Sequence, residues 1–196
     1  IFEKVKKKIT IDSATMMNKI FELIEAQKLF NIPKEKLDIL IHPQSLVHAI
    51  IVLKNGLTKF LYHPTSMIIP ISNAIYDDKL NIEDFMNIQK NKKRDIEKNL
   101  SFMKVNHKIF PMIKLKKKIN EYPSTPIIIN AANEVLVDQF LRNKLPFLGI
   151  FKTIKSILND KKYKKYAIKR ANNLNQIKMI DDWTKKLTLK KIKTYE

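Results

Sequence analysis

An Asn-Gly pair at residues 55–56 is the feature that most constrains the fold of the first half of this chain. It lies between two β-prone runs, residues 46–53 and 57–62. Because Asn-Gly favours the backbone of a tight turn, the pattern predicts an antiparallel β-hairpin. A further strand is predicted over residues 38–41, and it ends in the loop His-Pro-Gln-Ser at residues 42–45.

A helix is predicted before these strands. Asp12 or Ser13 can cap its start, and Asn-Ile-Pro at residues 31–33 ends it near Phe30. Its apolar residues recur at helical spacing and would form one side: Met17, Ile20, Phe21 and Ile24. Its polar residues would share another side: Thr15, Asn18, Lys19 and Glu22. The short run at residues 9–11 (Ile-Thr-Ile) is β-prone and leads into this helix.

The second half has the pattern of a small helical bundle. Helical stretches are predicted over residues 111–122, 127–141, 150–158 and 177–187. Before them come a short helix over residues 71–75 and a polar connection, residues 77–99, with at most one exposed helical segment. The predicted fold class is α/β (α+β): a small sheet with a β-hairpin and covering helices, then a C-terminal helical bundle. The expected domains are residues 1–104 and 105–196.

The start of the first helix combines groups suited to phosphate binding. A helix N-terminus carries free N–H groups and a partial positive charge, and Ser13, Asn18 and Lys19 would lie beside it. Glu22, one turn later, suits a metal ion or a ligand hydroxyl. An ordinary amphipathic helix with a solvated polar face is the alternative, and spacing alone favours it.

The histidines carry a weaker signal. His42 and His48 flank Pro-Gln-Ser, and His42 ends a predicted strand, where active-site residues often lie in open sheets. A packing or hydrogen-bonding role is the alternative, and it is favoured for each histidine taken alone. The sequence has no zinc-type histidine spacing and no Gly-rich phosphate loop. The polar run Asn-Ala-Ala-Asn-Glu at residues 130–134 is interpreted as helix capping plus an interface.

The net charge of +19 comes from 38 basic and 19 acidic residues. Such a charge is typical of nucleic-acid or anionic-membrane binding. The basic residues are nearly all scattered lysines accompanied by isoleucine and asparagine, so A- and T-rich codons explain the charge without a partner. The absence of cysteine excludes disulfides and thiolate chemistry. No apolar run is long enough to span a membrane. The chain begins with Ile1, so we expect a piece of a longer protein.

Three collinear segments resemble the 1-deoxy-D-xylulose 5-phosphate reductoisomerase family. The first is Lys-Ile-Thr-Ile-Asp-Ser-Ala-Thr-Met-Met-Asn-Lys at residues 8–19, followed by Glu22. The second is Ile-His-Pro-Gln-Ser-Leu-Val-His at residues 41–48, and the third is Ile-Asn-Ala-Ala-Asn-Glu at residues 129–134. The resemblance covers roughly residues 4–158 and identifies the C-terminal portion of the family.

The resemblance implies an activity and its cofactors. Enzymes of this family rearrange 1-deoxy-D-xylulose 5-phosphate and reduce the intermediate with NADPH, giving 2-C-methyl-D-erythritol 4-phosphate in non-mevalonate isoprenoid biosynthesis. They use Mg or Mn. They are usually homodimers of the bacterial cytoplasm or the plastid, and no membrane partner is expected.

The resemblance also assigns roles to residues. Ser13, Asn18 and Lys19 match substrate-binding residues, mainly for the phosphate, and Glu22 matches a metal ligand that touches substrate. His48 matches a histidine that supports catalysis. Met67 lies near a family methionine beside the nicotinamide, and Lys6 aligns with the family glycine that meets NADPH.

The family's N-terminal Rossmann domain and the segment with its other two metal carboxylates are absent from this chain. We therefore expect no activity from these 196 residues alone. The alternatives are a basic nucleic-acid-binding module, which the scattered distribution of the lysines disfavours, and a decayed remnant without catalysis.

Overall fold

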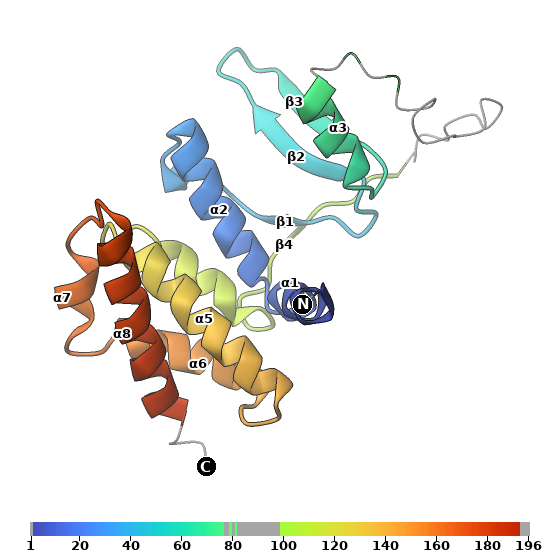
Figure 1. Cartoon of the computed structure of the whole chain (residues 1–196). Coiled ribbons are helices and arrows are strands. Elements are labelled where there is room, and N and C mark those ends of the chain that lie inside the picture. Colours follow the sequence, from blue (N-terminus) through green and yellow to red (C-terminus); the bar gives the residue numbers. More distant parts are fainter. Residues whose placement is uncertain (1, 77–78, 80, 82–98, 193–196) are drawn as a thin grey trace. The chain divides into compact units, whose positions relative to one another are not determined.

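The computed structural model describes residues 2–76, 79, 81 and 99–192, and its contacts divide the chain into two units (Figure 1). The helical unit combines residues 1–39 with 105–196, and the strand unit is residues 40–104. This division differs from the expected domains 1–104 and 105–196. The boundary after residue 104 agrees, but the first 39 residues pack with the C-terminal helices because the buried side of the first two helices lies against them.

The helical unit contains most of the regular structure. Its elements, in chain order, are α1 (Phe2–Ala14), α2 (Met17–Phe30), the 3₁₀ helices η1 (Lys34–Lys36) and η2 (Pro111–Lys117), α5 (Thr125–Leu141), α6 (Phe147–Leu158), α7 (Tyr163–Ala167) and α8 (Leu174–Ile192). The predicted helices over residues 127–141, 150–158 and 177–187 are confirmed. The stretch from residue 111 is a 3₁₀ helix that ends at Lys117, five residues earlier than predicted.

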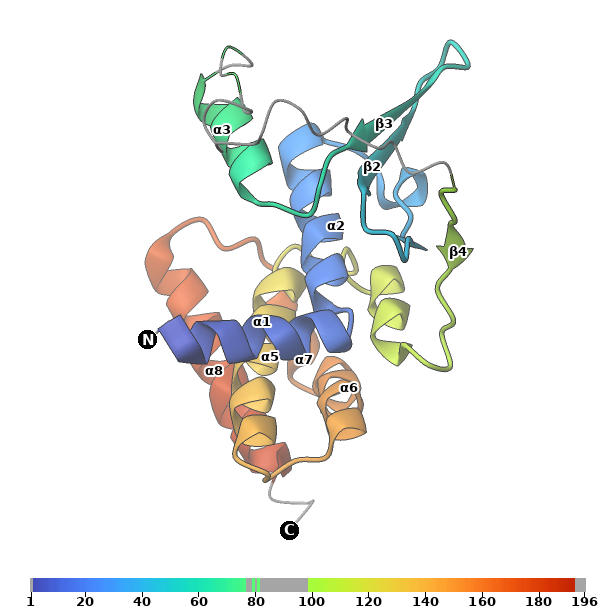
Figure 2. The ribbon, with the colours of Figure 1, turned by 90° about the vertical axis from the view of Figure 1, so that its right-hand side faces the viewer.

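Helix α5 forms the centre of the helical unit. It packs against α1, α6 and α8, and Figure 2 shows α1 lying across it. Pro126 in its first turn suits a helix start, because the N–H that proline lacks would have no partner there. Its side chains are buried on several sides, including Ile128, Ile129 and Leu136 at 0% exposure. Each such side chain contributes about 1.5–3 kcal/mol by leaving water.

Helix α8 packs against α5 through one buried side and one cluster of ion pairs. Ile180, Thr184 and Thr188 are buried, and each threonine hydroxyl donates to the carbonyl four residues earlier at 2.8 Å. Lys185 reaches Glu134 of α5 at 2.9 Å and Asp181 at 3.0 Å. Hydrogen bonds to these two carboxylates raise the pKa of Lys185. The cluster therefore adds a charged contact at the rim of an apolar interface.

The first helix begins earlier than predicted and then breaks. Residues 9–11 are helical, not extended, and Asp12 and Ser13 lie in the last turn of α1, so neither caps a helix start. The break follows at Met16, whose φ of 63° is left-handed, and α2 starts at Met17. Thr15 is buried, not on a shared polar side: its hydroxyl lies 3.0 Å from the Ile11 carbonyl and accepts the Met17 N–H at 3.3 Å. Local β propensity at residues 9–11 yields to packing of α1 on α5.

The strand unit contains the predicted hairpin. Strands β2 (Val47–Val52) and β3 (Thr58–Tyr62) pair antiparallel with Ile50 opposite Phe60. At the turn the Gly56 N–H donates to the Leu53 carbonyl at 3.1 Å, and Gly56 has φ of 87°. That left-handed conformation is the reason a glycine stands there. The hairpin prediction is confirmed.

A second small sheet pairs two strands that are distant in sequence. Strand β1 (Leu40–Ile41) pairs antiparallel with β4 (Met103–Lys104), which the sequence did not predict. The loop after β1 also contacts the segment before β4, because the Gln44 amide donates a hydrogen bond to the Ser101 hydroxyl at 3.0 Å. Helix α3 (Ile68–Tyr76) matches the helix predicted at residues 71–75. The mixed fold with a hairpin and a C-terminal helical bundle is thereby confirmed, while most of the predicted connection 77–99 lies outside the described residues.

The strand unit has little interior of its own. Only Ser72 is buried among its described residues, and its large apolar side chains are largely exposed, for example Val52 at 75% and Ile75 at 69%. The core of the chain thus lies in the helical unit. Within the described ranges, no helix combines the length and apolarity that crossing a bilayer requires.

Candidate functional site

The junction of α1 and α2 brings predicted site residues together. The Asn18 amide donates to the Ser13 hydroxyl at 2.8 Å, although five residues separate them. An unbroken helix would place residues five apart on different sides. The left-handed Met16 turns the chain so that Ser13, at the end of α1, faces the first turn of α2. The groups predicted to lie at a helix start thus lie at the start of α2, whose first residue is Met17 and not a residue directly after Asp12 or Ser13.

The first turn of α2 offers backbone donors at this junction. The leading N–H groups of a helix have no intrahelical partner. The Thr15 hydroxyl accepts a hydrogen bond from the Met17 N–H, and the N–H groups of Asn18 and Lys19 follow in the same first turn. The positive end of the helix dipole adds to the charge of Lys19. Such a combination of N–H groups, a hydroxyl and an ammonium suits an anion.

Lys19 and Glu22 are paired in the structure. The Lys19 ammonium lies 2.8 Å from Glu22 Oε1, and both side chains are about half exposed, at 47% and 54%. An exposed pair of this kind is worth only about 0–1 kcal/mol, so Lys19 can turn to a ligand at small cost. Lys19 thus neutralises Glu22 in the ligand-free chain and is available to a phosphate.

A buried polar contact supports the junction from α5. The Asp12 side chain is 2% exposed. Its carboxylate accepts hydrogen bonds from the Lys8 ammonium at 2.6 Å and from the Asn133 amide at 2.7 Å. Asn133 is fully buried and belongs to the polar run interpreted as capping plus an interface. The interface is with α1, but the contact to Asp12 was not predicted. A polar residue among apolar helix positions is the signal that could have indicated it.

The described residues do not by themselves fit a divalent cation. Within them, no group of three or more His, Cys, Asp or Glu side chains is arranged to hold a metal. Glu22 could supply one carboxylate, whereas Mg is typically held by one or two carboxylates together with substrate phosphates and waters. Any metal that Glu22 contacts would need further ligands.

His48 lies at an irregularity of the hairpin. The pairing of β2 with β3 shifts between Val47 and Ala49, so His48 occupies a β-bulge. Its ring stacks on that of His63 with centroids 3.8 Å apart, and its Nε2 lies 3.1 Å from the His63 carbonyl. Bulges often redirect side chains near active sites. His63 is therefore a partner of His48 that the sequence did not suggest.

The remaining predicted residues divide between the units. Lys6 lies on α1 and is exposed, in the same unit as Ser13 and Lys19. Met67 precedes α3 in the strand unit and is 72% exposed. His42 stacks on Phe102 with centroids 4.7 Å apart, and its Nδ1 lies 2.9 Å from the Ser101 carbonyl. A hydrogen-bonding role was the alternative considered for His42, and these contacts fit it.

Two family models match the chain. The DXP reductoisomerase C-terminal domain matches residues 63–187, and a second model, the 1-deoxy-D-xylulose 5-phosphate reductoisomerase C-terminal domain, matches residues 4–30. The chain is also 44% identical to the 1-deoxy-D-xylulose 5-phosphate reductoisomerase of Pelagibacter ubique over 183 residues, which is 90% of this chain and 45% of that protein. The homologue of Thermotoga neapolitana is 35% identical, over 92% of this chain and 45% of its own length.

Solved structures of 1-deoxy-D-xylulose 5-phosphate reductoisomerases also resemble this chain. The reductoisomerase of Zymomonas mobilis in complex with NADPH matches with a TM-score of 0.79 and 30% identity, over 94% of this chain and 47% of its own. A reductoisomerase in complex with NADPH, fosmidomycin and magnesium matches with a TM-score of 0.83 and 29% identity, over 95% of this chain and 46% of its own. The chain thus spans about half the length of the proteins it matches.

Proposed function

Since this chain belongs to the 1-deoxy-D-xylulose 5-phosphate reductoisomerase family, we propose that it forms the C-terminal part of an enzyme that converts this substrate to 2-C-methyl-D-erythritol 4-phosphate. The observation that supports this most directly is the Ser13–Asn18 hydrogen bond at the start of α2. It joins two residues of the longest family-like motif into one anion-binding arrangement.

The share of this chain in the reaction is binding and orientation of the substrate phosphate. Ser13 and Asn18 donate hydrogen bonds, the first N–H groups of α2 point to the anion, and Lys19 supplies charge. Holding the phosphate away from the reacting carbons restricts the substrate to one orientation, which lowers the entropic part of the barrier. Glu22 then takes a substrate hydroxyl or one position on a metal ion, and His48 supports catalysis.

Binding of the hydride donor and of a metal ion requires residues beyond those of this chain. Related structures carry NADPH and magnesium, so we propose NADPH and Mg or Mn as cofactors, with Glu22 as a ligand and Lys6 and Met67 near the nucleotide. Because Glu22 alone does not fit a divalent cation and the sequence has no dinucleotide fingerprint, no hydride or metal-assisted step is assigned to this chain alone.

Turnover tests the proposal in two arms. The chain alone should not oxidise NADPH in the presence of substrate and Mn. Mixed or co-expressed with the N-terminal half of the Pelagibacter homologue, it should do so, and Glu22→Gln should remove metal-dependent turnover. Robust turnover by the chain alone, or near-normal rates with Glu22→Gln, would contradict the division of ligands.

Phosphate binding tests the junction directly. In an NMR titration of the chain with inorganic phosphate, the backbone amides of Asn18 and Lys19 should shift. Lys19→Gln should weaken this binding by roughly tenfold, since it removes one charge-assisted hydrogen bond. Lys155→Gln, an exposed substitution on α6, is the control and should leave the titration unchanged. Equal weakening by both variants would indicate only non-specific attraction to a chain of net charge +19.

We propose in addition that the complete enzyme is a homodimer of a bacterial cytoplasm or a plastid. The exposed apolar side chains of the strand unit support assembly with further protein surface. Sedimentation of the reconstituted enzyme tests this, and a monomer at working concentration contradicts it. The nucleic-acid alternative predicts that the chain binds RNA or DNA. The logarithm of the binding constant should then fall, for each log unit of salt concentration, by about one unit per phosphate contacted.

A further inference from the structure

A cleft outside the α1–α2 junction, lined by both polar and apolar residues, has the features of a second ligand site. It encloses about 820 Å³ and lies within the helical unit, between the end of α2, the segment before α5 and the loop before α8. Ligand sites commonly measure ≈ 300–1,000 Å³. The cleft is therefore large enough for a small metabolite, and none of the predicted site residues lines it.

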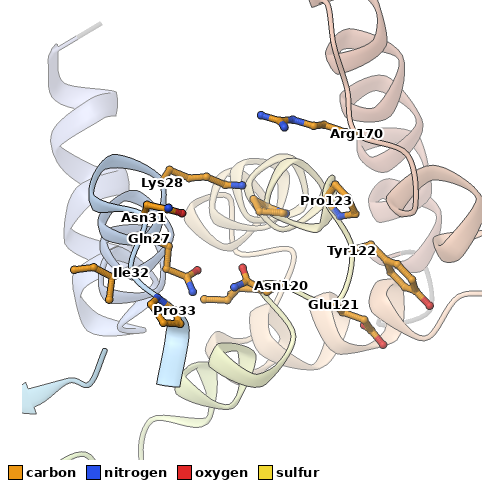
Figure 3. A pocket seen from close by; sticks show the side chains of 12 residues that line it. Gln27, Lys28, Asn31, Ile32, Pro33, Asn120, Glu121, Tyr122, Pro123 and Arg170 are labelled. Carbon is orange, nitrogen blue, oxygen red and sulfur yellow. The ribbon is translucent and has the colours of Figure 1, made fainter. Parts of the chain in front are cut away.

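Two cations border the opening from opposite sides. Lys28 extends from the last turn of α2 and Arg170 from the loop before α8, and both point toward the space between them (Figure 3). Both side chains are exposed, and neither forms a salt bridge with another residue of the described part of the chain. Their charges are thus available to a ligand.

The cleft lining also offers neutral hydrogen-bonding groups. Gln27 and Asn120 direct their amides toward one another across it, and Asn31 lies beside Lys28 (Figure 3). The start of α5 also borders the cleft through Pro123 and Pro126, and it contributes partial positive charge. Lys28 offsets the opposite partial charge at the end of α2.

The one carboxylate of the lining does not cancel this charge. Glu121 points away from Lys28 and Gln27 (Figure 3). Its oxygens accept the Lys118 ammonium at 2.7 Å and the Tyr163 hydroxyl at 3.2 Å. The cleft consequently presents two cations and three amides, without an opposing free carboxylate.

We propose that this cleft binds a small organic phosphate, with the phosphoryl group between Lys28 and Arg170 and the organic part against the amides. A phosphomonoester carries close to two negative charges at neutral pH, which matches two cations. Arginine binds phosphate oxygens in pairs, and lysine supplies a point charge. Asn120 and Gln27 then form hydrogen bonds with hydroxyl or amide groups of the ligand. The site is separate from the proposed substrate phosphate site at Ser13, Asn18 and Lys19.

Calorimetric titration of the chain with AMP and with glycerol 3-phosphate, at low salt, tests this proposal. We expect saturable binding of at least one, and a roughly tenfold loss with Lys28→Gln or Arg170→Gln, because each removes a charge-assisted hydrogen bond. Both residues are exposed, so the variants should keep the fold, as checked by circular dichroism. Asn120→Ala should weaken AMP more than inorganic phosphate.

Control variants separate this site from the others. Lys155→Gln removes an exposed charge that does not line the cleft, and Lys19→Gln removes the junction lysine. Neither variant should change the affinity of the cleft for its ligand. Conversely, Lys28→Gln should leave the phosphate-induced NMR shifts of the Asn18 and Lys19 amides unchanged. Three outcomes would overturn the proposal: no binding at roughly 10 mM ligand, which is weaker than the millimolar affinity of a weak specific site, equal losses of affinity in all variants, or binding of citrate in place of both phosphates.

Discussion

The Asn133 amide donates to the Asp12 carboxylate at 2.7 Å, and this contact joins α5 to the end of α1 across 121 residues of sequence. Asp12 directly precedes Ser13, whose hydroxyl accepts the Asn18 amide. A fully buried side chain of the bundle therefore holds the residue next to Ser13, which belongs to the candidate phosphate site. Packing of the helical unit and geometry of the site are coupled at this point.

Asn133→Ala should lower the free energy of unfolding by about 2–3 kcal/mol, because the buried Asp12 carboxylate loses a hydrogen bond. Urea unfolding followed by fluorescence of the single tryptophan, Trp183, measures this. The exposed neighbour Asn130 is the matched control, and Asn130→Ala should stay within about 0.5 kcal/mol of the parent chain. Equal effects of the two substitutions would show that Asn133 contributes no more than helix propensity.

Asn133→Asp should be more damaging than Asn133→Ala at neutral pH, since it places a second carboxylate against Asp12. The extra loss should diminish as the pH falls, because the introduced carboxyl then becomes protonated and uncharged. Unfolding midpoints at pH 7 and pH 4 provide the comparison. A pH-independent difference between the two variants would argue against close contact of the two side chains.

Thr15→Val should loosen the α1–α2 junction. The substitution keeps the shape of the side chain but removes the hydroxyl that accepts the Met17 N–H, at a cost of about 1 kcal/mol. Phosphate binding at Asn18 and Lys19 should weaken in parallel. Thr10→Val is the control, since Thr10 is exposed on the same helix and its hydroxyl donates a hydrogen bond to the Lys6 carbonyl within that helix. Unchanged phosphate affinity in Thr15→Val would separate the hydroxyl from the site.

Gly149→Ala should destabilise the bundle despite the better helix propensity of alanine. An added Cβ would lie 2.8 Å from Leu145 Cδ1 and 3.2 Å from Pro146 Cδ. The crowding costs about 1–3 kcal/mol and propensity returns about 1 kcal/mol. In a Leu145→Ala background the two shortest contacts, both with Leu145, are lost and the 3.2 Å contact with Pro146 Cδ remains, so Gly149→Ala should cost much less than in the parent chain. A double-mutant cycle in urea measures the coupling, and additive effects would contradict it.

Asp160 should stabilise the chain only above acidic pH. Burial acts to raise the pKa of Asp160, but the Lys162 N–H and the Lys191 ammonium outweigh it, so the pKa lies below its ordinary 3.8. The stabilisation is therefore present above the unfolded pKa and lost as the pH falls through the folded one. Asp160→Asn should cost less than about 1 kcal/mol at pH 7, because the pair is partly exposed. The difference in the free energy of unfolding between Asp160→Asn and the parent chain should shrink as the pH is lowered from 7 into the acidic range. Urea unfolding at several pH values measures it, and a pH-independent difference would contradict the role of the carboxylate.

Several parts of the fold followed from local sequence. The Asn-Gly turn with β-prone runs on either side predicted the hairpin, since Gly56 requires a left-handed backbone. The helices of the second half followed from apolar spacing, because helical periodicity survives in any packing that buries one side. Strand β4 and helix α7 were missed because each is short, with two and five residues, and carries too little pattern to recognise.

The sequence by itself determined the residue types of the candidate site and their order: a hydroxyl, a carboxamide, an ammonium and a carboxylate between Ser13 and Glu22. Only the tertiary structure decided how they meet. Helical periodicity describes an unbroken helix, whereas packing of α1 on α5 and the left-handed Met16 divide this segment into two helices. That break creates the Ser13–Asn18 contact, and the buried Asp12–Asn133 hydrogen bond that supports it depends on a residue 121 positions away.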